Sequence, residues 1–216
     1  MADPVTELVS LLRAVGMAEF VVIGGLAVRF LTDERTARHT RDIDLVAMNN
    51  DARDRLVAQL ESIGYRVGAT AGWHRAAMPQ PAPRPIVDIA TNPIVNPRTF
   101  EELTLRGQPV PHKLEDMTVQ VVSPNDLALL KLAAHRDQDV VDLLLLSERL
   151  SPKAIAGAAE LDDVERTVSE GAQTARLLTA RGGLTDLTEE LLGRQATPRE
   201  IESFERFLRD LEEEGL

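Results

Sequence analysis

The feature that most constrains the fold is the apolar stretch from Phe20 to Leu31, which two adjacent glycines divide. The run Phe20–Ile23 is rich in β-branched residues, which predicts a short buried strand. Gly24 and Gly25 end this run, and the apolar residues then continue without alternation, as they do in a buried helix. We therefore expect a strand, a Gly-Gly turn and a helix in direct succession.

The same stretch and the cysteine content exclude several classes of protein. Arg29 interrupts the apolar residues, and no basic segment followed by an apolar one stands at the N-terminus, so we expect neither export nor membrane insertion. A cytoplasmic location is the expectation. The chain has no cysteine, which excludes disulfides, thiolate catalysis and cysteine-ligated zinc.

The rest of the chain changes pattern near Ser123. Before it, segments typical of strands alternate with segments typical of helices; after it, only helical patterns occur. This change predicts two domains, residues 1–122 and residues 123–216. The segments expected to be strands are 42–46, 65–67, 73–78, 86–90 and 119–122, and the expected helices are 4–15, 50–63, 123–135, 138–149, 152–158, 161–180 and one that starts near 197.

Charge is distributed unevenly between these two parts. The net charge is −11, but residues 1–122 carry 13 basic and 15 acidic residues, so most of the excess negative charge lies in the C-terminal part. A strongly acidic protein is a poor general binder of nucleic acid, because phosphate backbones attract basic surfaces. The nearly neutral N-terminal part leaves a nucleotide or RNA partner possible without indicating one.

Asp42 and Asp44 are the clearest candidates for chemistry. They are two residues apart on an expected strand, so both carboxylates project from one face while Ile43 anchors the other. Adjacent carboxylates suit Mg²⁺, which takes one or two of them together with waters and substrate phosphates. Asp88, on a later alternating strand, is a third candidate, either as a ligand of a second metal or as a proton acceptor. The alternative is that Asp-x-Asp simply marks a solvated strand end.

The Gly-Gly turn is a candidate phosphate site. A turn without Cβ atoms, followed by a helix N-terminus, lets backbone N–H groups approach a triphosphate closely. Two glycines are also what any tight turn can contain, so this signal is weak when taken alone.

These pieces together resemble a known family. The order Gly24-Gly25-x-Ala-Val, a spacer, and Arg38-x-Thr40-x-Asp42-x-Asp44 is similar to the minimal nucleotidyltransferases of the DNA polymerase β superfamily, and most of all to the AbiEii/AbiGii-type toxins. A second block, Ser123-Pro-Asn-Asp-Leu with Lys131 and then Arg136-x-x-Asp139-x-x-Asp142, resembles the family's later motif. The resemblance covers roughly residues 18–146.

The resemblance implies an α+β fold with a nucleotidyltransferase-like mixed sheet flanked by helices, followed by a C-terminal helical region. In it, Asp42, Asp44 and Asp88 hold Mg²⁺, with two ions expected, and the helical domain contributes Lys131 and Asp139 to the site. The catalytic residues are then Asp42, Asp44, Asp88, Lys131 and Asp139, and the nucleotide-binding residues are Gly24, Gly25, Arg38, Thr40, Lys131 and Arg136. From the residues alone, Lys131 could instead direct its ammonium to the surface, and Arg136, Asp139 and Asp142 could form a solvated helix face.

The implied activity is transfer of a nucleoside monophosphate from an NTP to an acceptor hydroxyl. The AbiEii-type resemblance points to a toxin of a toxin–antitoxin or phage-defence system that acts on tRNA or protein and has a cognate antitoxin. An antibiotic-modifying nucleotidyltransferase is one alternative, since an acidic surface attracts a cationic drug. A non-catalytic binding module on the same fold is another. Trp73, His74 and Arg75 could contact a substrate, although the pattern favours a surface hairpin.

Overall fold

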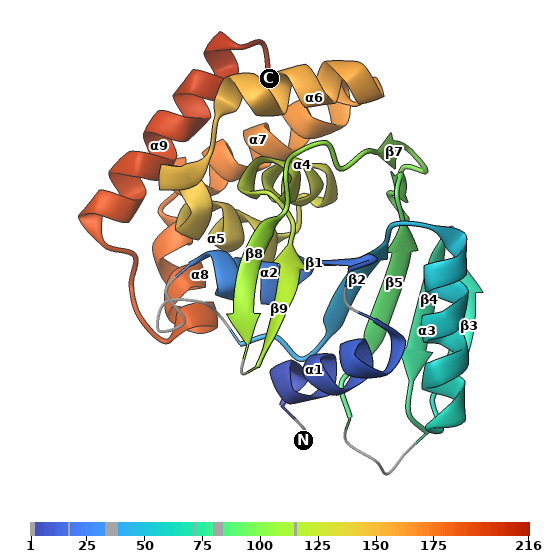
Figure 1. Cartoon of the computed structure of the whole chain (residues 1–216). Coiled ribbons are helices and arrows are strands. Elements are labelled where there is room, and N and C mark those ends of the chain that lie inside the picture. The colour runs from blue at the N-terminus through green and yellow to red at the C-terminus, as the bar shows by residue number, and fades with distance from the viewer. Residues whose placement is uncertain (1–2, 17, 33–38, 71, 80–83, 115) are drawn as a thin grey trace. The chain divides into compact units, whose positions relative to one another are not determined.

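The computed structural model describes residues 3–216 apart from 17, 33–38, 71, 80–83 and 115. The chain divides into two compact units (Figure 1). The first comprises Met1–Phe30 and Thr40–Val122, and the second comprises Ser123–Leu216 with Leu31, Thr32 and His39. Each unit has its own core and is described separately.

The first unit is built on a seven-stranded mixed sheet with the order β3-β4-β5-β2-β1-β9-β8. The pairs β2/β5 and β1/β9 are parallel, and the other neighbours are antiparallel. A separate two-stranded ribbon, β6/β7, follows β5. The strands are β1 (Phe20–Ile23), β2 (Ile43–Ala47), β3 (Arg66–Thr70), β4 (Trp73–Ala77), β5 (Val87–Thr91), β6 (Ile94–Val95), β7 (Glu102–Leu103), β8 (Val110–Leu114) and β9 (Met117–Val121).

The helices of the first unit pack on the sheet or connect its strands. Helix α1 (Pro4–Val15) and helix α3 (Asn50–Ser62) pack against each other, and α3 also packs on β2, β3, β4 and β5 (Figure 1). Helix α2 (Gly24–Leu31) begins where β1 ends, so the expected strand, glycine turn and helix are confirmed. The central strands are rich in apolar residues, and these residues form the core: β1 is buried throughout, and Ile43, Leu45 and Ile89 are inaccessible to solvent.

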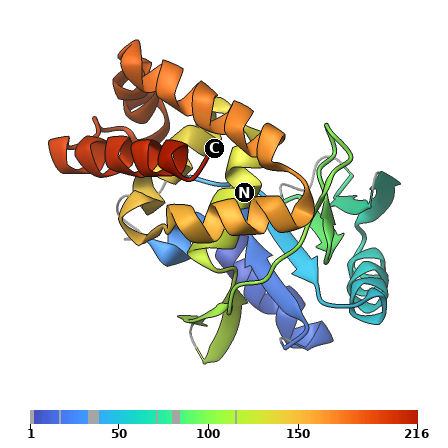
Figure 2. The ribbon, with the colours of Figure 1, turned by 90° about the horizontal axis from the view of Figure 1, so that it is seen from above.

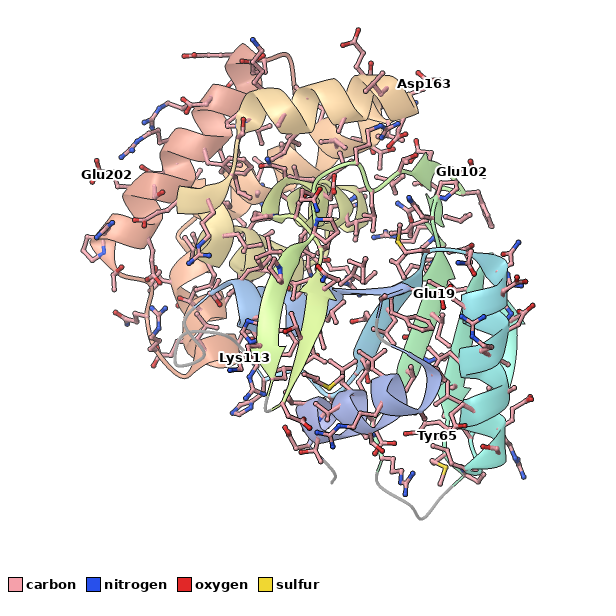
Figure 3. The ribbon with its side chains drawn as sticks, viewed as in Figure 1. Glu19, Tyr65, Glu102, Lys113, Asp163 and Glu202 are labelled. Atoms are coloured by element: carbon pink, nitrogen blue, oxygen red, sulfur yellow. The ribbon has the colours of Figure 1, made fainter. Side chains whose placement is uncertain are left out.

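Tyr65 ties the start of the ribbon formed by β3 and β4 to the rest of this unit (Figure 3). Its hydroxyl donates to the carbonyl of Pro85 at 3.1 Å and contacts Glu7 Oε1 at 3.3 Å. Burial together with the negative charge of Glu7 raises the pKa of Tyr65 to about 12. The tyrosine is therefore a neutral structural anchor at physiological pH.

The second unit is helical. Its elements are α4 (Pro124–Ala134), α5 (Asp137–Leu146), a 3₁₀ turn η1 (Ser147–Arg149), α6 (Pro152–Asp162), α7 (Glu165–Ala180), α8 (Gly183–Leu192) and α9 (Pro198–Glu213). Helix α4 packs against α5, α6 and α7, and α9 packs against α5, α6 and α7 (Figure 2). Gly171 of α7 permits a close approach to α4, because a Cβ there would lie 2.1 Å from the carbonyl oxygen of Leu132. Phe204 and Leu211 of α9 are fully buried.

The α+β fold class with a mixed sheet is confirmed, but four elements were not expected from the sequence. β6 and β7 have two residues each, too few for any periodicity to show. β8 is an edge strand that contains Pro111 and Lys113, residues typical of edges and not of buried strands. α8 follows Gly182 and begins at Gly183, and paired glycines normally end a helix. Among the residues described, no helix combines the length and the hydrophobicity needed to cross a membrane.

Candidate active site

Asp44 and Asp88 face each other across two neighbouring parallel strands. The register of β2 and β5 places Asp44 opposite Asp88, flanked by the buried pairs Ile43–Val87 and Leu45–Ile89. Adjacent strands are about 4.8 Å apart, and directly opposite residues share a sheet face. The strands thus present two half-buried carboxylates side by side on one face while their neighbours fill the core on the other.

The same row of opposite residues continues across the sheet in both directions. Arg75 of β4 lies opposite Asp88, and Gly68 of β3 lies opposite Arg75. On the other side, Ile23 of β1 lies opposite Asp44. One row across the strands therefore contains Gly68, Arg75, Asp88, Asp44 and Ile23. Ile23 is followed directly by the Gly-Gly turn.

Gly24, which follows Ile23, lies in direct contact with Asp44. A Cβ added to Gly24 would lie 2.0 Å from Asp44 Oδ2 and 2.7 Å from its Cγ, and the backbone φ of Gly24 is +64°. No other residue type accommodates both conditions, because a side chain would collide with the carboxylate and the left-handed conformation would be strained. Gly25 is buried in the next position, where α2 starts. The glycine turn is thereby fixed against the acidic strand.

Asp42 stands at the entry to β2, two residues before Asp44 and half-buried. The Thr40 hydroxyl donates to the Asp42 carbonyl at 3.4 Å, and the Ile43 amide donates to Ile86 at 2.8 Å, so the start of β2 is held from both sides. Arg38, the remaining residue of this motif, lies outside the described residues. Three of the expected site residues, Asp42, Asp44 and Asp88, are thus brought together with Gly24 in one unit.

The electrostatics of Asp88 show how closely the acidic groups interact. Burial raises the pKa of Asp88 above its ordinary value, the guanidinium of Arg75 opposes that rise, and the charge of Asp42 adds to it. Arg75 Nε lies 3.7 Å from Asp88 Oδ1, beyond hydrogen-bonding distance, and its side chain is 60% exposed. Among the residues that the structure describes, the cation paired with Asp88 is therefore a solvent-facing arginine that is not hydrogen-bonded to the carboxylate.

These carboxylates match the donor chemistry of a divalent cation. Neighbouring negative charges on one face repel each other and are stabilised by a counter-charge. Among the residues that the structure describes, no three or more His, Cys, Asp and Glu side chains already form a group that could hold a metal by themselves. Mg²⁺ needs only one or two protein carboxylates when waters and substrate phosphates complete its shell, and Asp42 and Asp44 supply those. The residues present therefore fit a divalent cation whose remaining ligands are waters or phosphates.

The second unit contains a buried charge cluster around Lys131. Its ammonium lies 2.7 Å from Asp139 Oδ1 and 2.6 Å from Asp142 Oδ2, and Lys131 is 3% exposed while both aspartates are inaccessible. Arg136 adds a second cation, with Nε 2.7 Å from Asp139 Oδ2. The lysine does not reach the surface; α4 and α5 are joined by an ion network inside their own unit.

The charges of this network hold one another ionised. Burial alone would lower the pKa of Lys131, but Asp142 and Asp139 raise it above its ordinary value. Burial alone would raise the pKa of Asp139, but Lys131 and Arg136 hold it below its ordinary value. The roles that the family resemblance implies for Lys131, Arg136 and Asp139 toward a nucleotide remain predictions. Asp142 was not expected as a partner of the lysine, although its position three residues after Asp139 on one helix face signalled it.

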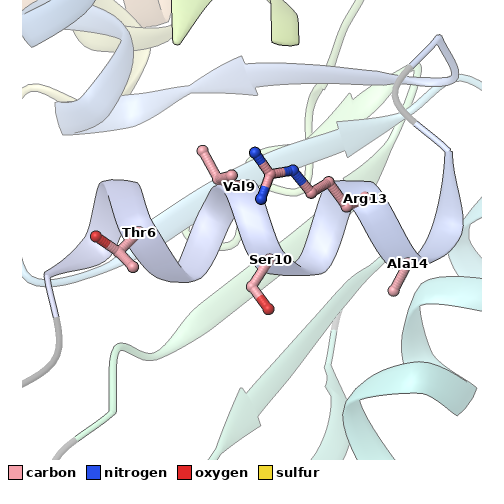
Figure 4. Close-up of a pocket in the computed structure, with 5 residues that line it drawn as sticks. All are labelled: Thr6, Val9, Ser10, Arg13 and Ala14. Carbon is pink, nitrogen blue, oxygen red and sulfur yellow. The ribbon is translucent and has the colours of Figure 1, made fainter. Parts of the chain in front are cut away.

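A shallow depression on α1 offers a different kind of surface (Figure 4). Its lining consists of Thr6, Val9, Ser10, Arg13 and Ala14. The charged member, Arg13, is ion-paired with Asp116. This lining contains no carboxylate that could hold a divalent cation, so the acidic row of the sheet remains the candidate site.

A model of one protein family matches most of the chain. The model of the family described as nucleotidyltransferase of unknown function (DUF6036) matches residues 4–173, which include every described residue discussed above for the site. No curated protein matches the sequence.

Several solved structures of low sequence identity are similar to this chain. ANT(2″)-Ia, in complex with adenylyl-2″-tobramycin, has a TM-score of 0.52 at 17% identity and covers 78% of this chain and 97% of its own. An antigenic nucleotidyltransferase-like protein from Paracoccidioides brasiliensis has a TM-score of 0.49 at 17% identity, covering 86% and 90%. The nucleotidyltransferase toxin MenT4 from Mycobacterium tuberculosis H37Rv has a TM-score of 0.42 at 17% identity, covering 96% and 91%. Of these three, ANT(2″)-Ia shares the fold of this chain, and at 17% identity that likeness concerns the fold alone.

Proposed function

The chain belongs to the nucleotidyltransferase family DUF6036 and is an enzyme of that class, and we propose that it transfers a nucleoside monophosphate from an NTP to an acceptor hydroxyl with the help of Mg²⁺. The observation that carries the proposal is the close approach of Gly24 to the carboxylate of Asp44, which lies opposite Asp88 on the neighbouring strand. It joins a turn open to phosphate with carboxylates suited to a divalent cation.

Each part of the row has a task in this reaction. The triphosphate lies against the backbone of Gly24 and Gly25, where amides at the start of α2 face its negative charge. Asp42 and Asp44 would hold Mg²⁺, and Asp88 would join them at a second ion or accept a proton. Bound there, the metal supplies charge neutralisation for the phosphates and for the leaving group.

The transfer is an in-line displacement at the α-phosphorus. The acceptor oxygen forms a bond to that phosphorus, the bond from phosphorus to the bridging oxygen breaks, and pyrophosphate leaves with the electron pair. The acceptor's hydroxyl proton passes to Asp88, a carboxylate whose raised pKa makes it a better base than an ordinary aspartate.

The remaining expected residues belong to the proposal as supporting groups. Thr40 is bonded to the backbone at Asp42 and would position the motif, with Arg38 near it in sequence contributing positive charge. We also propose that the helical domain, residues 123–216, contributes Lys131, Arg136 and Asp139 to nucleotide binding. For Lys131, a role in nucleotide binding is separable from stability by the KM for NTP of the folded Lys131→Met protein.

For the biological role we propose a toxin of the AbiEii type, part of a toxin–antitoxin or phage-defence system, with tRNA or a protein as acceptor and a cognate antitoxin as inhibitor. The support is the motif order from Gly24 to Asp44. An antibiotic-modifying enzyme is the competing role. The ANT(2″)-Ia fold is shared, but a shared fold does not fix the acceptor.

The test is transfer of label from α-labelled NTPs by the full chain. Label in tRNA or in a protein side chain supports the toxin, whereas label in an aminoglycoside supports the resistance enzyme. Absence of transfer with all four NTPs and with each acceptor class contradicts the proposed activity. The Asp44→Asn protein serves as the inactive control.

A further inference from the structure

The segment before Asp88 has an unusual distribution of charge. Acidic residues occupy 35 of 216 positions, roughly one in six, yet residues 62–87 contain none. That segment includes the β3/β4 ribbon and carries Arg66, Arg75 and Arg84. In a chain with net charge −11, it is a locally basic region directly before Asp88.

The ribbon turns two of these arginines toward the face that carries the carboxylates. Arg66 lies opposite Ala77, Gly68 opposite Arg75, and Thr70 opposite Trp73. Because opposite residues in an antiparallel pair share a face, and because Arg75 lies opposite Asp88, all of these residues lie on the face of Asp44 and Asp88. Arg84, in contrast, pairs with Glu7, with its Nη1 3.5 Å from Glu7 Oε1.

The surface around Arg75 is open. β3 is an edge strand whose residues Arg66, Gly68, Ala69 and Thr70 are all exposed. A Cβ added to Gly68, the neighbour of Arg75, would meet no atom within 4 Å. Space for a ligand therefore exists beside a 60% exposed guanidinium that is not hydrogen-bonded to Asp88.

Trp73 gives the ribbon a second recognition element. Its indole Nε1 donates to the carbonyl of Val95 at 2.6 Å, which fixes the ring while the side chain remains partly exposed. The turn that precedes it is also held, since a Cβ on Gly72 would lie 3.0 Å from Val95 Cγ2. A fixed, partly exposed aromatic ring beside arginines is the combination on which bases of single-stranded nucleic acid stack.

We propose that the face of the β3/β4 ribbon formed by Arg66, Arg75 and Trp73 binds the acceptor, and that this acceptor is a single-stranded end of RNA. The inference rests on the proposed nucleotidyl transfer, because that reaction requires an acceptor next to Asp88. Charge decides between acceptor classes. On this face the two strands of the ribbon carry two arginines and no acidic residue, so beyond Asp88 they attract phosphates and repel a polycationic drug, even though the whole chain is acidic.

The experiment uses the full chain, an oligouridylate of about ten nucleotides and a buffer without divalent cations, so that binding is measured apart from catalysis. Trp73 is the single tryptophan of the chain, so its fluorescence reports binding at the ribbon directly. Affinity is measured over a range of salt concentrations. Each phosphate contact contributes about 0.7 to the slope of log K against log salt for single strands.

The test variant is Arg66→Gln/Arg75→Gln. Its control, Arg181→Gln/Arg209→Gln, removes the same charge from two exposed arginines of the second unit. We expect the ribbon variant to bind more weakly with a salt slope shallower by about 1.4, and the control to keep the wild-type slope. Equal slopes for the two variants, or no quenching of Trp73 by RNA in the wild type, overturn the inference.

The labelled-NTP assay then separates the two proposals. If label enters RNA and the ribbon variant raises the KM for that RNA, both stand. If label enters only a protein or an aminoglycoside, the RNA site is wrong while nucleotidyl transfer is right. If RNA binds through the ribbon but no NTP yields label, the binding surface stands and the proposed activity fails.

Discussion

The backbone of Gly24 approaches the carboxylate of Asp44 so closely that a Cβ on residue 24 would lie 2.0 Å from Asp44 Oδ2. The contact joins the end of β1 to the acidic strand β2, whose register already places Ile23 opposite Asp44. A change of one methyl group at Gly24 therefore acts on the proposed metal ligand itself. The first prediction uses this relationship.

Gly24→Ala should lower kcat/KM for nucleotidyl transfer by about 10²-fold, because the displaced carboxylate no longer holds the reacting groups in place. Gly193→Ala is the matched control. Gly193 has nearly the same φ, +65° against +64°, but a Cβ there meets nothing within 4 Å. Both variants place alanine at a positive φ and so share the backbone strain. Steady-state kinetics together with thermal melts therefore isolates the effect of the collision between the new Cβ and Asp44. Equal activity in the two variants would contradict the assignment of Asp44.

Asp44→Asn and Asp42→Asn keep the shape of each side chain and remove its charge. We expect each to reduce kcat by about 10³-fold, a loss typical of removing electrostatic stabilisation from a transition state. Asp51→Asn, an exposed acid in the first turn of α3, should leave kcat unchanged. Pyrophosphate release measures all three, and full activity in the Asp44 variant would be incompatible with the site.

Lys131→Met tests the buried network of the second unit. The substitution leaves Asp142 buried without its cation, and we expect the free energy of unfolding to fall by about 3–5 kcal/mol. Removing that carboxylate as well, in Lys131→Met/Asp142→Asn, should recover part of the loss. Lys153→Met, at an exposed position of α6, should change stability little. Urea denaturation compares these proteins.

A separate kinetic measurement decides whether Lys131 also serves the nucleotide. Under conditions where the variant remains folded, a role in phosphate binding raises the KM for NTP beyond any change in the amount of folded protein. An unchanged KM in the folded Lys131→Met protein would confine the lysine to structure.

Glu200 gives a prediction for acid stability. Its carboxylate accepts two hydrogen bonds from Arg194, at 2.6 and 2.9 Å, and caps α9 by accepting from the Thr197 amide at 2.7 Å. The hydrogen bond to Arg194, with those from Thr197, lowers the pKa of Glu200 from 4.5 to about 2. A pKa that is depressed in the folded state contributes stability above the unfolded value and loses it as pH falls toward the folded value.

We therefore expect Glu200→Gln to unfold more easily than the wild type at pH 7, by about 1 kcal/mol for this partly exposed pair. The difference should shrink as pH falls through the window from 4.5 to about 2. Thermal melts across that range measure it. A constant difference at every pH would show that the carboxylate charge is not responsible.

The sequence predicted the parts of the molecule whose signals are local. Phe20–Ile23, the glycines and the helix after them could be recognised because a β-branched run and two Cβ-free residues act on their own neighbours. The alternation around Asp44 and Asp88 likewise fixed which residues face the core. What the alternation could not supply was the pairing of β2 with β5, because register between distant strands leaves no mark on either strand alone.

The position of Arg75 depends on the same long-range pairing. The expected surface hairpin exists in β3 and β4, but nothing near Arg75 in sequence places it opposite Asp88; the order β4-β5-β2 does. For Lys131 the sequence indicated an unusual environment but not the partners of the side chain. Its apolar neighbours signalled a special environment, but only the packing of α4 on α5 shows two aspartates enclosing its ammonium.

The central claim is that Asp42 and Asp44 hold a divalent cation beside a glycine turn that receives phosphate. The most direct measurement is anomalous diffraction from crystals of the chain grown with Mn²⁺ and a non-hydrolysable NTP. We expect an anomalous peak at ligand distance from a carboxylate oxygen of Asp44 and from the phosphates, with the triphosphate against the backbone of Gly24 and Gly25. A bound nucleotide whose metal lies away from both aspartates would contradict it.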